Sequence, residues 1–150
     1  MLKKGDKLPA VTLKDHNNND VKLSDFVGKP LVVFFYPKDN TQVCTAQACG
    51  FRDHFGDFLE LDTQVIGISK DSVKSHAKVV EKRKLPFPLL SDTYGQALKA
   101  FKVSTYLFGI LSARCTFVID KDGIIQHSFR EDLKADYHIK KSLEALSELA

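Results

Sequence analysis

The chain has 150 residues, of which 43% are hydrophobic and 27% charged, a composition typical of one soluble domain with a substantial core. This length leaves no room for a second domain, so we expect residues 1–150 to fold as one unit. The formal net charge of +3 is small and the basic residues are interspersed with acidic ones, which argues against nucleic acid as a partner.

The sequence also limits where the protein is expected to work. No apolar run approaches the roughly 20 residues of a membrane span, so we expect no membrane partner. Residues 1–6 lack the apolar stretch of a secretory signal. Three cysteines in such a chain are too few for a disulfide scaffold at this length and suit a reducing compartment. We therefore expect a cytoplasmic protein.

The first third of the chain predicts a hairpin, a buried strand and a helix. Alternating segments at 11–13 and 21–23 flank a turn-rich stretch, which indicates an N-terminal β-hairpin. The apolar run 31–36 indicates a buried strand. A helix is expected at 43–60 because apolar residues recur there at three- and four-residue steps, namely Ala48, Phe51, Phe55, Phe58 and Leu59.

A second strand and helix follow. Residues 64–69 form another apolar run and indicate a strand. A helix is expected at 72–84, with Asp71 or Ser72 as its cap. Two prolines keep residues 85–90 out of a helix and favour an extended segment.

The last third predicts a short helix, a hairpin and a final helix. The short helix is expected near 93–101, capped by residues 91–92. Strands at 115–120 and 124–129 flank an Asp-Gly turn, which is a strong hairpin signal. The final helix is expected at 134–149.

The order of these elements predicts an α/β fold. Strands that alternate with helices, followed by a late hairpin, favour a mixed central sheet flanked by helices on both faces. The arrangement matches a thioredoxin-like fold with an added N-terminal β-hairpin.

Cys44 is the most informative residue for function. It lies in the first turn of the helix that follows the strand at 31–36. Free backbone N–H groups and the positive end of the helix dipole favour a thiolate there, and a thiolate is a nucleophile. Cys44 also precedes Ala48 by four residues on the apolar stripe, so it should face inward at the rim of the core.

Cys49 follows five residues later on the same predicted helix. Two residues at this spacing have Cα atoms about 8.6 Å apart in a regular helix. A disulfide needs about 4.4–6.8 Å, so Cys44 and Cys49 can pair only if the helix unwinds locally. This behaviour suits a redox cycle better than a fixed staple.

Three further residues suit a reaction of the Cys44 thiolate with a small oxygen substrate. Thr41 can place a hydroxyl beside the sulfur, and Pro37 ends the strand, lacks an N–H and can shield the thiolate from water. Arg114 precedes the strand at 115–120, which should lie beside the strand at 31–36. It would supply a permanent positive charge.

These residues resemble a known family. The spacing Pro37-x-x-x-Thr41-x-x-Cys44, with Ala48-Cys49-Gly50-Phe51-Arg52-Asp53 after it, resembles the signature of the peroxiredoxins, in particular the bacterioferritin comigratory protein (BCP) or PrxQ-like branch. Similar stretches occur at 67–72, 85–92 and 114–120, so the likeness covers nearly the whole chain.

The resemblance implies that Cys44 is the peroxidatic cysteine and Cys49 the resolving cysteine, with Pro37, Thr41 and Arg114 completing the site. The implied activity is reduction of hydrogen peroxide and organic hydroperoxides through a Cys44 sulfenic acid. An intramolecular disulfide would then be reduced by thioredoxin or a glutaredoxin. The resemblance implies no metal, haem or flavin cofactor, and the intramolecular pair suits a monomer.

Two positions depart from the branch. Gln42-Val43 stands where Pro-Gly usually precedes the peroxidatic cysteine, which should change the stiffness of the loop and access to the sulfur. Cys115 follows the arginine where Ser, Thr or Val is more usual. We expect a buried, inert thiol at Cys115, although it would lie near Cys44 if the two strands are neighbours.

Two other functions are known on this fold. A disulfide oxidoreductase would carry Cys-x-x-Cys, which this chain lacks. A copper-binding chaperone of the Sco type would have closer cysteines, a downstream histidine ligand and usually an export signal. Zinc is not expected either, since Cys44, Cys49 and His54 step by five residues and share no helix face.

Overall fold

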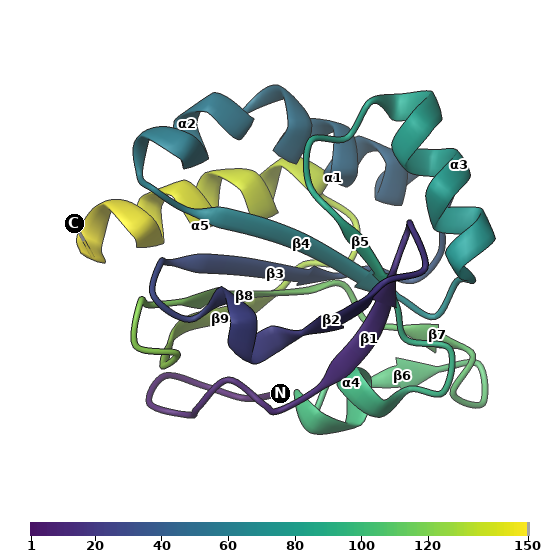
Figure 1. The fold of residues 1–150 in the computed structure, drawn as a ribbon, viewed down its shortest axis with the longest axis horizontal. Coiled ribbons are helices and arrows are strands. Elements are labelled where there is room, and N and C mark those ends of the chain that lie inside the picture. The colour runs from purple at the N-terminus through teal and green to yellow at the C-terminus, as the bar shows by residue number, and fades with distance from the viewer. Residues whose placement is uncertain (150) are drawn as a thin grey trace.

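A computed structural model describes residues 1–149 and shows a twisted mixed sheet with helices packed against it (Figure 1). The seven strands are ordered β2-β1-β5-β4-β3-β8-β9. Their bounds are Thr12–Asp15 (β1), Asp20–Lys22 (β2), Leu31–Phe35 (β3), Gln64–Ser69 (β4), Leu89–Ser91 (β5), Cys115–Ile119 (β8) and Ile125–Arg130 (β9). Strands β3, β4 and β5 run parallel, and the other pairs are antiparallel. The predicted mixed sheet and both hairpins are confirmed.

The helices cover the two faces of the sheet unequally. Helices α1, α2, α3 and α5 lie above the sheet in Figure 1, and the short α4 lies below it. A 3₁₀ turn, Leu23–Phe26, follows β2. The helix bounds are Gln42–Asp53 (α1), Phe55–Glu60 (α2), Val73–Arg83 (α3), Gln96–Ala100 (α4) and Ala135–Leu149 (α5). Among residues 1–149, no helix has the length and apolar character needed to cross a bilayer.

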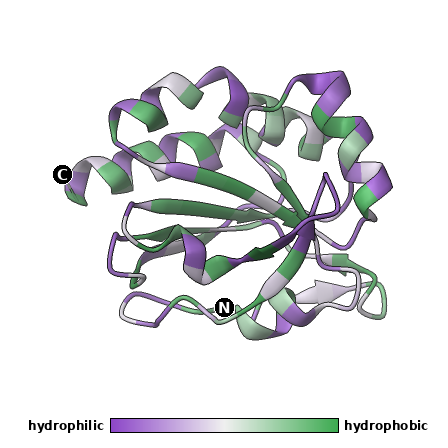
Figure 2. Ribbon diagram, viewed as in Figure 1, coloured by the Kyte–Doolittle hydropathy of each residue, from purple (hydrophilic) through white to green (hydrophobic). Residues whose placement is uncertain are grey.

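The central strand β3 divides the core into two halves. All five of its side chains are buried, because both faces of the sheet are covered. Phe34 stacks on Phe51 of α1 with ring centroids 4.6 Å apart, whereas Phe35 points to the other face and packs on Phe101 and Phe117. The green strands in the middle of Figure 2 follow this burial. The strand that leads to Cys44 is therefore held from both sides.

The prediction of one continuous helix at 43–60 is wrong, because the structure has two helices there. The predicted helix breaks at His54, whose backbone lies at φ −99° and ψ 10°, and α2 begins at Phe55. His54 and Gly56 are both weak helix formers, which makes this the natural place for a break. The break also shifts the helical phase, so Phe58 is buried while Leu59 is exposed to solvent rather than part of the apolar stripe.

The end of the chain's middle third also differs from the prediction. The helix expected near 93–101 begins only at Gln96, because Gly95 adopts a left-handed φ of +73°. The N-cap is Gly95 rather than residue 91 or 92, although the Asp92 carboxylate accepts from the N–H groups of Ala97 and Leu98 in the first turn, both at 2.9 Å. Beyond α4, a small hairpin of β6 (Thr105–Tyr106) and β7 (Leu111–Ser112) was not predicted.

The closest packing in the sheet gives a stability prediction. A Cβ on Gly67 of β4 would lie 2.6 Å from Phe34 Cζ and 2.8 Å from Leu89 Cδ2. Both neighbours are fully buried, so Gly67→Ala should lower the free energy of unfolding by about 1–3 kcal/mol, measured by urea denaturation. Gly56→Ala is the control, because nothing lies within 4 Å of its added Cβ, and it should be neutral or stabilising. Equal effects of the two substitutions would contradict this packing.

Candidate functional site

Cys44 lies in the first turn of α1, immediately beyond the loop that leaves β3. Its side chain is buried and faces the sheet, in a cluster with Tyr36, which directly follows β3, and Ala48 of α1. The helix is regular from its start, with the N–H of Thr45 bonded to the carbonyl of Thr41 at 2.9 Å. The sulfur therefore lies near the N-terminal end of the helix dipole, where a negative charge is stabilised.

Arg114 brings a positive charge to this sulfur. Strands β3 and β8 pair so that Phe35 lies opposite Cys115, and Arg114 directly precedes β8. Its Nη2 donates to Cys44 Sγ at 3.2 Å, although Arg114 is only 3% exposed. A guanidinium at this distance attracts negative charge that forms on the sulfur or on an oxygen bound beside it.

The guanidinium is fixed by two other groups. Its Nη1 donates to Gln47 Oε1 at 2.7 Å, and its Nε donates to the carbonyl of Asp132 at 3.2 Å. The Arg114 N–H also donates to the Asp132 carboxylate at 3.1 Å. Three fixed contacts leave the arginine little freedom, so one N–H remains aimed at the sulfur.

Gln47 is a site residue that the sequence analysis missed. It lies one turn after Cys44, is completely buried, and its Nε2 has no hydrogen-bond partner among the described residues. The signal that could have identified it is its position three residues beyond Cys44 on the inward side of the helix, where a polar residue is unusual. Because Gln47 is neutral, it orients Arg114 without competing with the sulfur for positive charge.

Thr41 and Pro37 lie on the loop between β3 and α1. Thr41 is exposed at the N-cap of α1, but its hydroxyl makes no cap bond and instead donates to the Lys38 carbonyl at 2.9 Å. Pro37 is half-buried and lines a hollow of 310 Å³ together with residues of β7 and of the stretch after β4. Of the predicted site residues, the structure therefore brings Arg114 into contact with Cys44, whereas Thr41 bonds to Lys38 and Pro37 lines a hollow that Cys44 does not line.

This loop is anchored by a buried carboxylate, Asp39. Its Oδ1 accepts from the Tyr36 hydroxyl at 2.6 Å, and its Oδ2 accepts from Ser75 Oγ and His76 Nδ1, both at 2.8 Å. The backbone N–H of Asp39 donates to Asp71 Oδ2 at 2.8 Å. The loop before Cys44 is thus tied to both β4 and α3.

The charge on Asp39 follows from these contacts. Burial is the largest single influence and raises the pKa of Asp39, but the hydrogen bonds and the charge of His76 outweigh it and leave the pKa lowered. His76 Nε2 also faces the Leu90 carbonyl at 3.1 Å, so the ring lies between the Asp39 carboxylate and a backbone carbonyl. Burial and the Asp39 carboxylate raise the pKa of Tyr36 well above its ordinary value, which keeps it a donor.

The other two cysteines occupy different surroundings. Cys49 is free and half-buried, within the same regular helix as Cys44, so the two thiols are too far apart to be bonded in this conformation. Cys115 lies on the opposite face of the sheet from Cys44, packed with the Phe35 side of the core. Burial raises the pKa of the Cys115 thiol to about 11, and such a thiol is a poor nucleophile at neutral pH.

His138 of α5 supports the loop that holds Arg114. Its Nε2 donates to the Glu131 carbonyl at 2.7 Å, and its Nδ1 accepts from Thr116 Oγ1 at 2.7 Å. A neutral ring with its proton on Nε2 satisfies both contacts, with the Thr116 hydroxyl as donor to Nδ1. Burial, the largest influence, and the nearby Arg114 lower the pKa of His138, which agrees with that tautomer.

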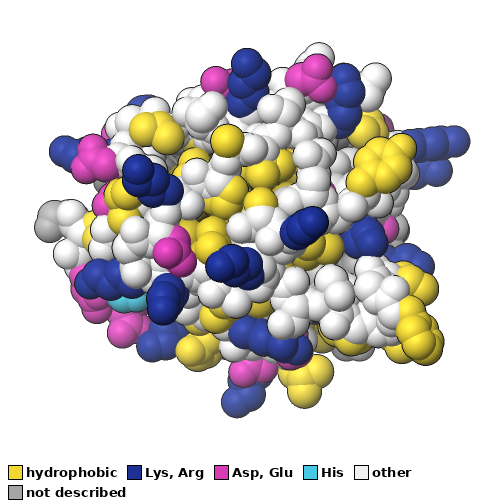
Figure 3. Space-filling model, turned by 90° about the horizontal axis from the view of Figure 1, so that it is seen from below, with side chains coloured by type: hydrophobic (Ala, Val, Ile, Leu, Met, Phe, Trp, Pro, Cys, Tyr) yellow, Lys and Arg dark blue, Asp and Glu magenta, His cyan; other side chains and the backbone are white. Residues whose placement is uncertain are grey.

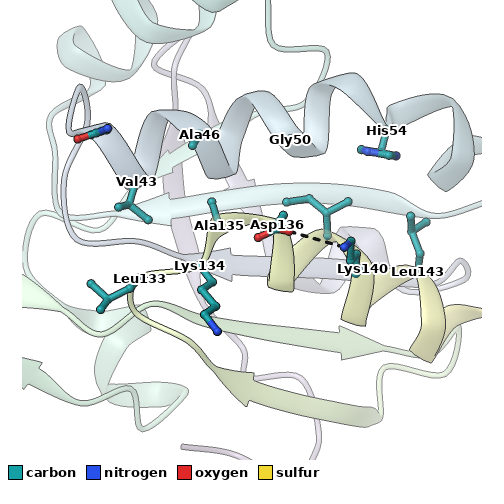
Figure 4. Close-up of a pocket in the computed structure, with 12 residues that line it drawn as sticks. Val43, Ala46, Gly50, His54, Leu133, Lys134, Ala135, Asp136, Lys140 and Leu143 are labelled. Atoms are coloured by element: carbon teal, nitrogen blue, oxygen red, sulfur yellow. Dashed lines mark ion pairs between the residues drawn. The ribbon is translucent and has the colours of Figure 1, made fainter.

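A groove of 560 Å³ lies on the other side of α1, between α1 and α5 (Figure 4). Val43, Ala46 and Gly50 line it from α1, and Ile139 and Leu143 line it from α5. Cys44 and Cys49 are not among the lining residues, so the groove is separate from the reaction centre. Among residues 1–149, no group of three or more His, Cys, Asp or Glu could hold a metal ion.

Comparisons with known proteins agree with this geometry. Residues 4–128 match the AhpC/TSA family. The chain is 44% identical to "Peroxiredoxin Q, chloroplastic" of Sedum lineare over 146 residues, which cover 97% of this chain and 78% of that protein. It is 43% identical to "Peroxiredoxin Q, chloroplastic" of Oryza sativa subsp. japonica, covering 99% of this chain and 68% of that protein.

Solved structures give the same result. The fold superposes on Peroxidoxin BcpB from Mycobacterium tuberculosis with a TM-score of 0.93 and 36% identity, over 100% of this chain and 99% of that one. It superposes on the bacterioferritin comigratory protein of Xanthomonas campestris, described with an alkyl peroxide reduction activity, with a TM-score of 0.86 and 28% identity, over 96% and 99% of the two chains. The predicted resemblance and the thioredoxin-like fold are confirmed.

The neutral partner of Arg114 gives the first prediction for this site. Gln47→Glu places a carboxylate on Nη1, which draws positive charge away from Cys44 Sγ. We expect the rate of Cys44 alkylation by iodoacetamide at neutral pH to fall by about tenfold. In Gln47→Met, which keeps the side-chain volume without adding charge, the alkylation rate should fall much less. Equal losses in both variants would show that only packing matters at this position.

The buried His138 gives a prediction about pH. Its lowered pKa means that the folded protein keeps the ring neutral, while the unfolded chain takes up a proton below about pH 6.5. The free energy of unfolding, measured by urea denaturation, should therefore decrease between about pH 7.5 and 5.5, and His138→Gln should weaken that decrease. Substitution of the exposed His54 by Gln is the control. If the free energy of unfolding of His138→Gln depends on pH as it does in the wild type, His138 is not the cause of the decrease.

Proposed function

Because the chain belongs to the AhpC/TSA family, in the branch of peroxiredoxin Q and the bacterioferritin comigratory proteins, it is a thiol peroxidase, and we propose that Cys44 attacks the peroxide. The observation that supports this assignment is the contact of 3.2 Å between Arg114 Nη2 and Cys44 Sγ. A buried cysteine at a helix start, hydrogen-bonded to a buried arginine, is arranged for nucleophilic chemistry.

In the first step, the Cys44 thiolate attacks one oxygen of the peroxide in line with the O–O bond. That bond breaks, the leaving oxygen takes up a proton and departs as water or an alcohol, and Cys44 becomes a sulfenic acid. Arg114 can stabilise the negative charge that develops on the peroxide oxygens, because its other N–H groups are already fixed by Gln47 and Asp132. Thr41 would reach the peroxide after its hydroxyl leaves the Lys38 carbonyl.

In the second step, Cys49 condenses with the sulfenic acid, and one water molecule is released as the disulfide forms. The Cα atoms of two residues spaced like Cys44 and Cys49 lie about 8.6 Å apart in a regular helix, so α1 must unwind for this step. The helix carries no side-chain cap at Thr41 and breaks at His54, and both features make unwinding easier. A dithiol protein, thioredoxin or a glutaredoxin, would then reduce the disulfide.

We propose that the protein works as a monomer, because an intramolecular disulfide needs no second chain. We also propose that it is cytoplasmic and that its substrates are hydrogen peroxide and organic hydroperoxides. The alternative of a general disulfide oxidoreductase is disfavoured, since such proteins need two cysteines close together in the resting state.

The cycle is tested by following peroxide-dependent NADPH oxidation with thioredoxin and its reductase. Cys44→Ser should abolish turnover, because no nucleophile remains. Cys49→Ser should consume about one peroxide per protein and then stop, because a sulfenic acid without a partner thiol is not recycled. Cys115→Ser is the matched control and should turn over normally, because Cys115 lies on the other face of the sheet. Normal turnover in Cys44→Ser would disprove the assignment.

A further inference from the structure

The hairpin β6–β7 carries a cluster of exposed apolar side chains at its tip. Tyr106 is 42% exposed, Leu107 59%, Ile110 65% and Phe108 105%. Single exposed apolar residues are ordinary on protein surfaces, but four within five residues form a contiguous patch. Figure 3, which views the molecule from below, shows yellow hydrophobic side chains protruding at the right-hand edge, where this hairpin lies in Figure 1. We call residues 106–110 the apolar tip.

The fold holds the apolar tip out into solvent. Leu107 and Phe108 adopt left-handed backbone conformations, with φ of 51° and 58°, which are unfavourable for bulky residues. They are kept there by the pairing of β6 with β7 and by Lys70, whose Nζ donates to the Gly109 carbonyl at 2.9 Å. A tip free to relax would bury these side chains, so its extended form indicates a surface built to meet an apolar partner.

Two lysines lie beside the apolar tip. Lys38 and Lys70 line the same hollow as Ile110, and Lys70 also reaches the tip through its bond to the Gly109 carbonyl. The acidic residue in that hollow, Asp71, is engaged internally by Ser69 Oγ at 2.6 Å. An apolar tip with a tyrosine, bordered by lysines, combines the two attractions that bring proteins to anionic lipid surfaces, namely insertion of side chains and attraction to headgroups.

The apolar tip also lies beside the loop between β3 and α1. Ile110 and Leu111 share the 310 Å³ hollow with Pro37 and Lys38 of this loop, which leads to Cys44. We propose that the apolar tip inserts into the surface of anionic phospholipid membranes and thereby presents Cys44 to hydroperoxides held in the lipid. The second half of this statement depends on the proposed peroxidase cycle, whereas the binding does not.

The expectation of no membrane partner rests on the lack of an apolar run long enough to span a bilayer, and a short surface loop leaves no such signal. A second copy of the chain is a poorer occupant, because a symmetric contact through the apolar tip would bring the lysines of both copies together. An anionic lipid surface satisfies both the apolar side chains and the lysines.

The binding is tested by co-sedimentation with vesicles of phosphatidylcholine alone and of an equal mixture of phosphatidylcholine and phosphatidylglycerol. We expect binding to the mixed vesicles that weakens with added salt. The double variant Leu107→Asn/Phe108→Asn should bind at least tenfold more weakly, since it removes two of the four apolar side chains available for insertion. Asn is chosen because it tolerates left-handed φ values, so the loop keeps its shape.

The matched control is Leu59→Asn, because Leu59 has the same 59% exposure as Leu107 but lies on α2. It should bind vesicles like the wild type. Absence of binding to mixed vesicles, or equal binding by the double variant, would overturn the proposal. If the wild type is a dimer by light scattering and does not bind vesicles, and the double variant is a monomer, the apolar tip serves self-association instead.

The catalytic consequence is tested separately. With hydrogen peroxide in solution, the double variant should turn over like the wild type. With a phospholipid hydroperoxide in mixed vesicles, its rate should be about tenfold lower. If the wild type does not turn over hydrogen peroxide, the peroxidase cycle is refuted, whereas the proposed vesicle binding is unaffected. Equal rates of both proteins on the vesicle substrate would refute the docking role.

Discussion

The contact between Arg114 and Cys44 depends on keeping a charged guanidinium away from water. A buried cation is costly unless charged or polar groups surround it, and an error in their geometry would remove the benefit. Here each of the three guanidinium nitrogens donates to one acceptor, namely the Cys44 sulfur, the Gln47 amide oxygen or the Asp132 carbonyl. The pairing of β3 with β8 brings these groups together, so the middle of the sheet determines the reactivity of the cysteine.

Two buried polar clusters support this arrangement from opposite sides. Asp39 ties the loop before Cys44 to α3 through His76, and His138 ties α5 to the segment that holds Arg114. Each histidine bonds a backbone carbonyl through Nε2, so each joins a helix to the main chain of a neighbouring element. Unlike apolar packing, these bonds are directional, and they fix the two ends of the site to within hydrogen-bond tolerance.

Much of this could be predicted from the sequence, because strands, turns and the Cys44 motif depend on local patterns. Arg114 was identified by its place before a central strand. Gln47 and His76 were not, since a polar residue in an amphipathic helix resembles a solvated one until its partner on another element is known. The break at His54 and the hairpin β6–β7 were missed for a related reason, because tertiary packing overrides weak local preferences there.

The close approach of α1 to α5 has a consequence for damage. A Cβ on Gly50 would lie 2.8 Å from Ile139 Cδ1, so the two helices pack almost backbone to side chain. In the proposed cycle α1 must leave this contact before Cys49 can react. A stronger contact would then lengthen the lifetime of the sulfenic acid. A longer lifetime would give a second peroxide time to oxidise Cys44 irreversibly to the sulfinic acid, so in this cycle the packing of Gly50 would limit tolerance to high peroxide concentrations.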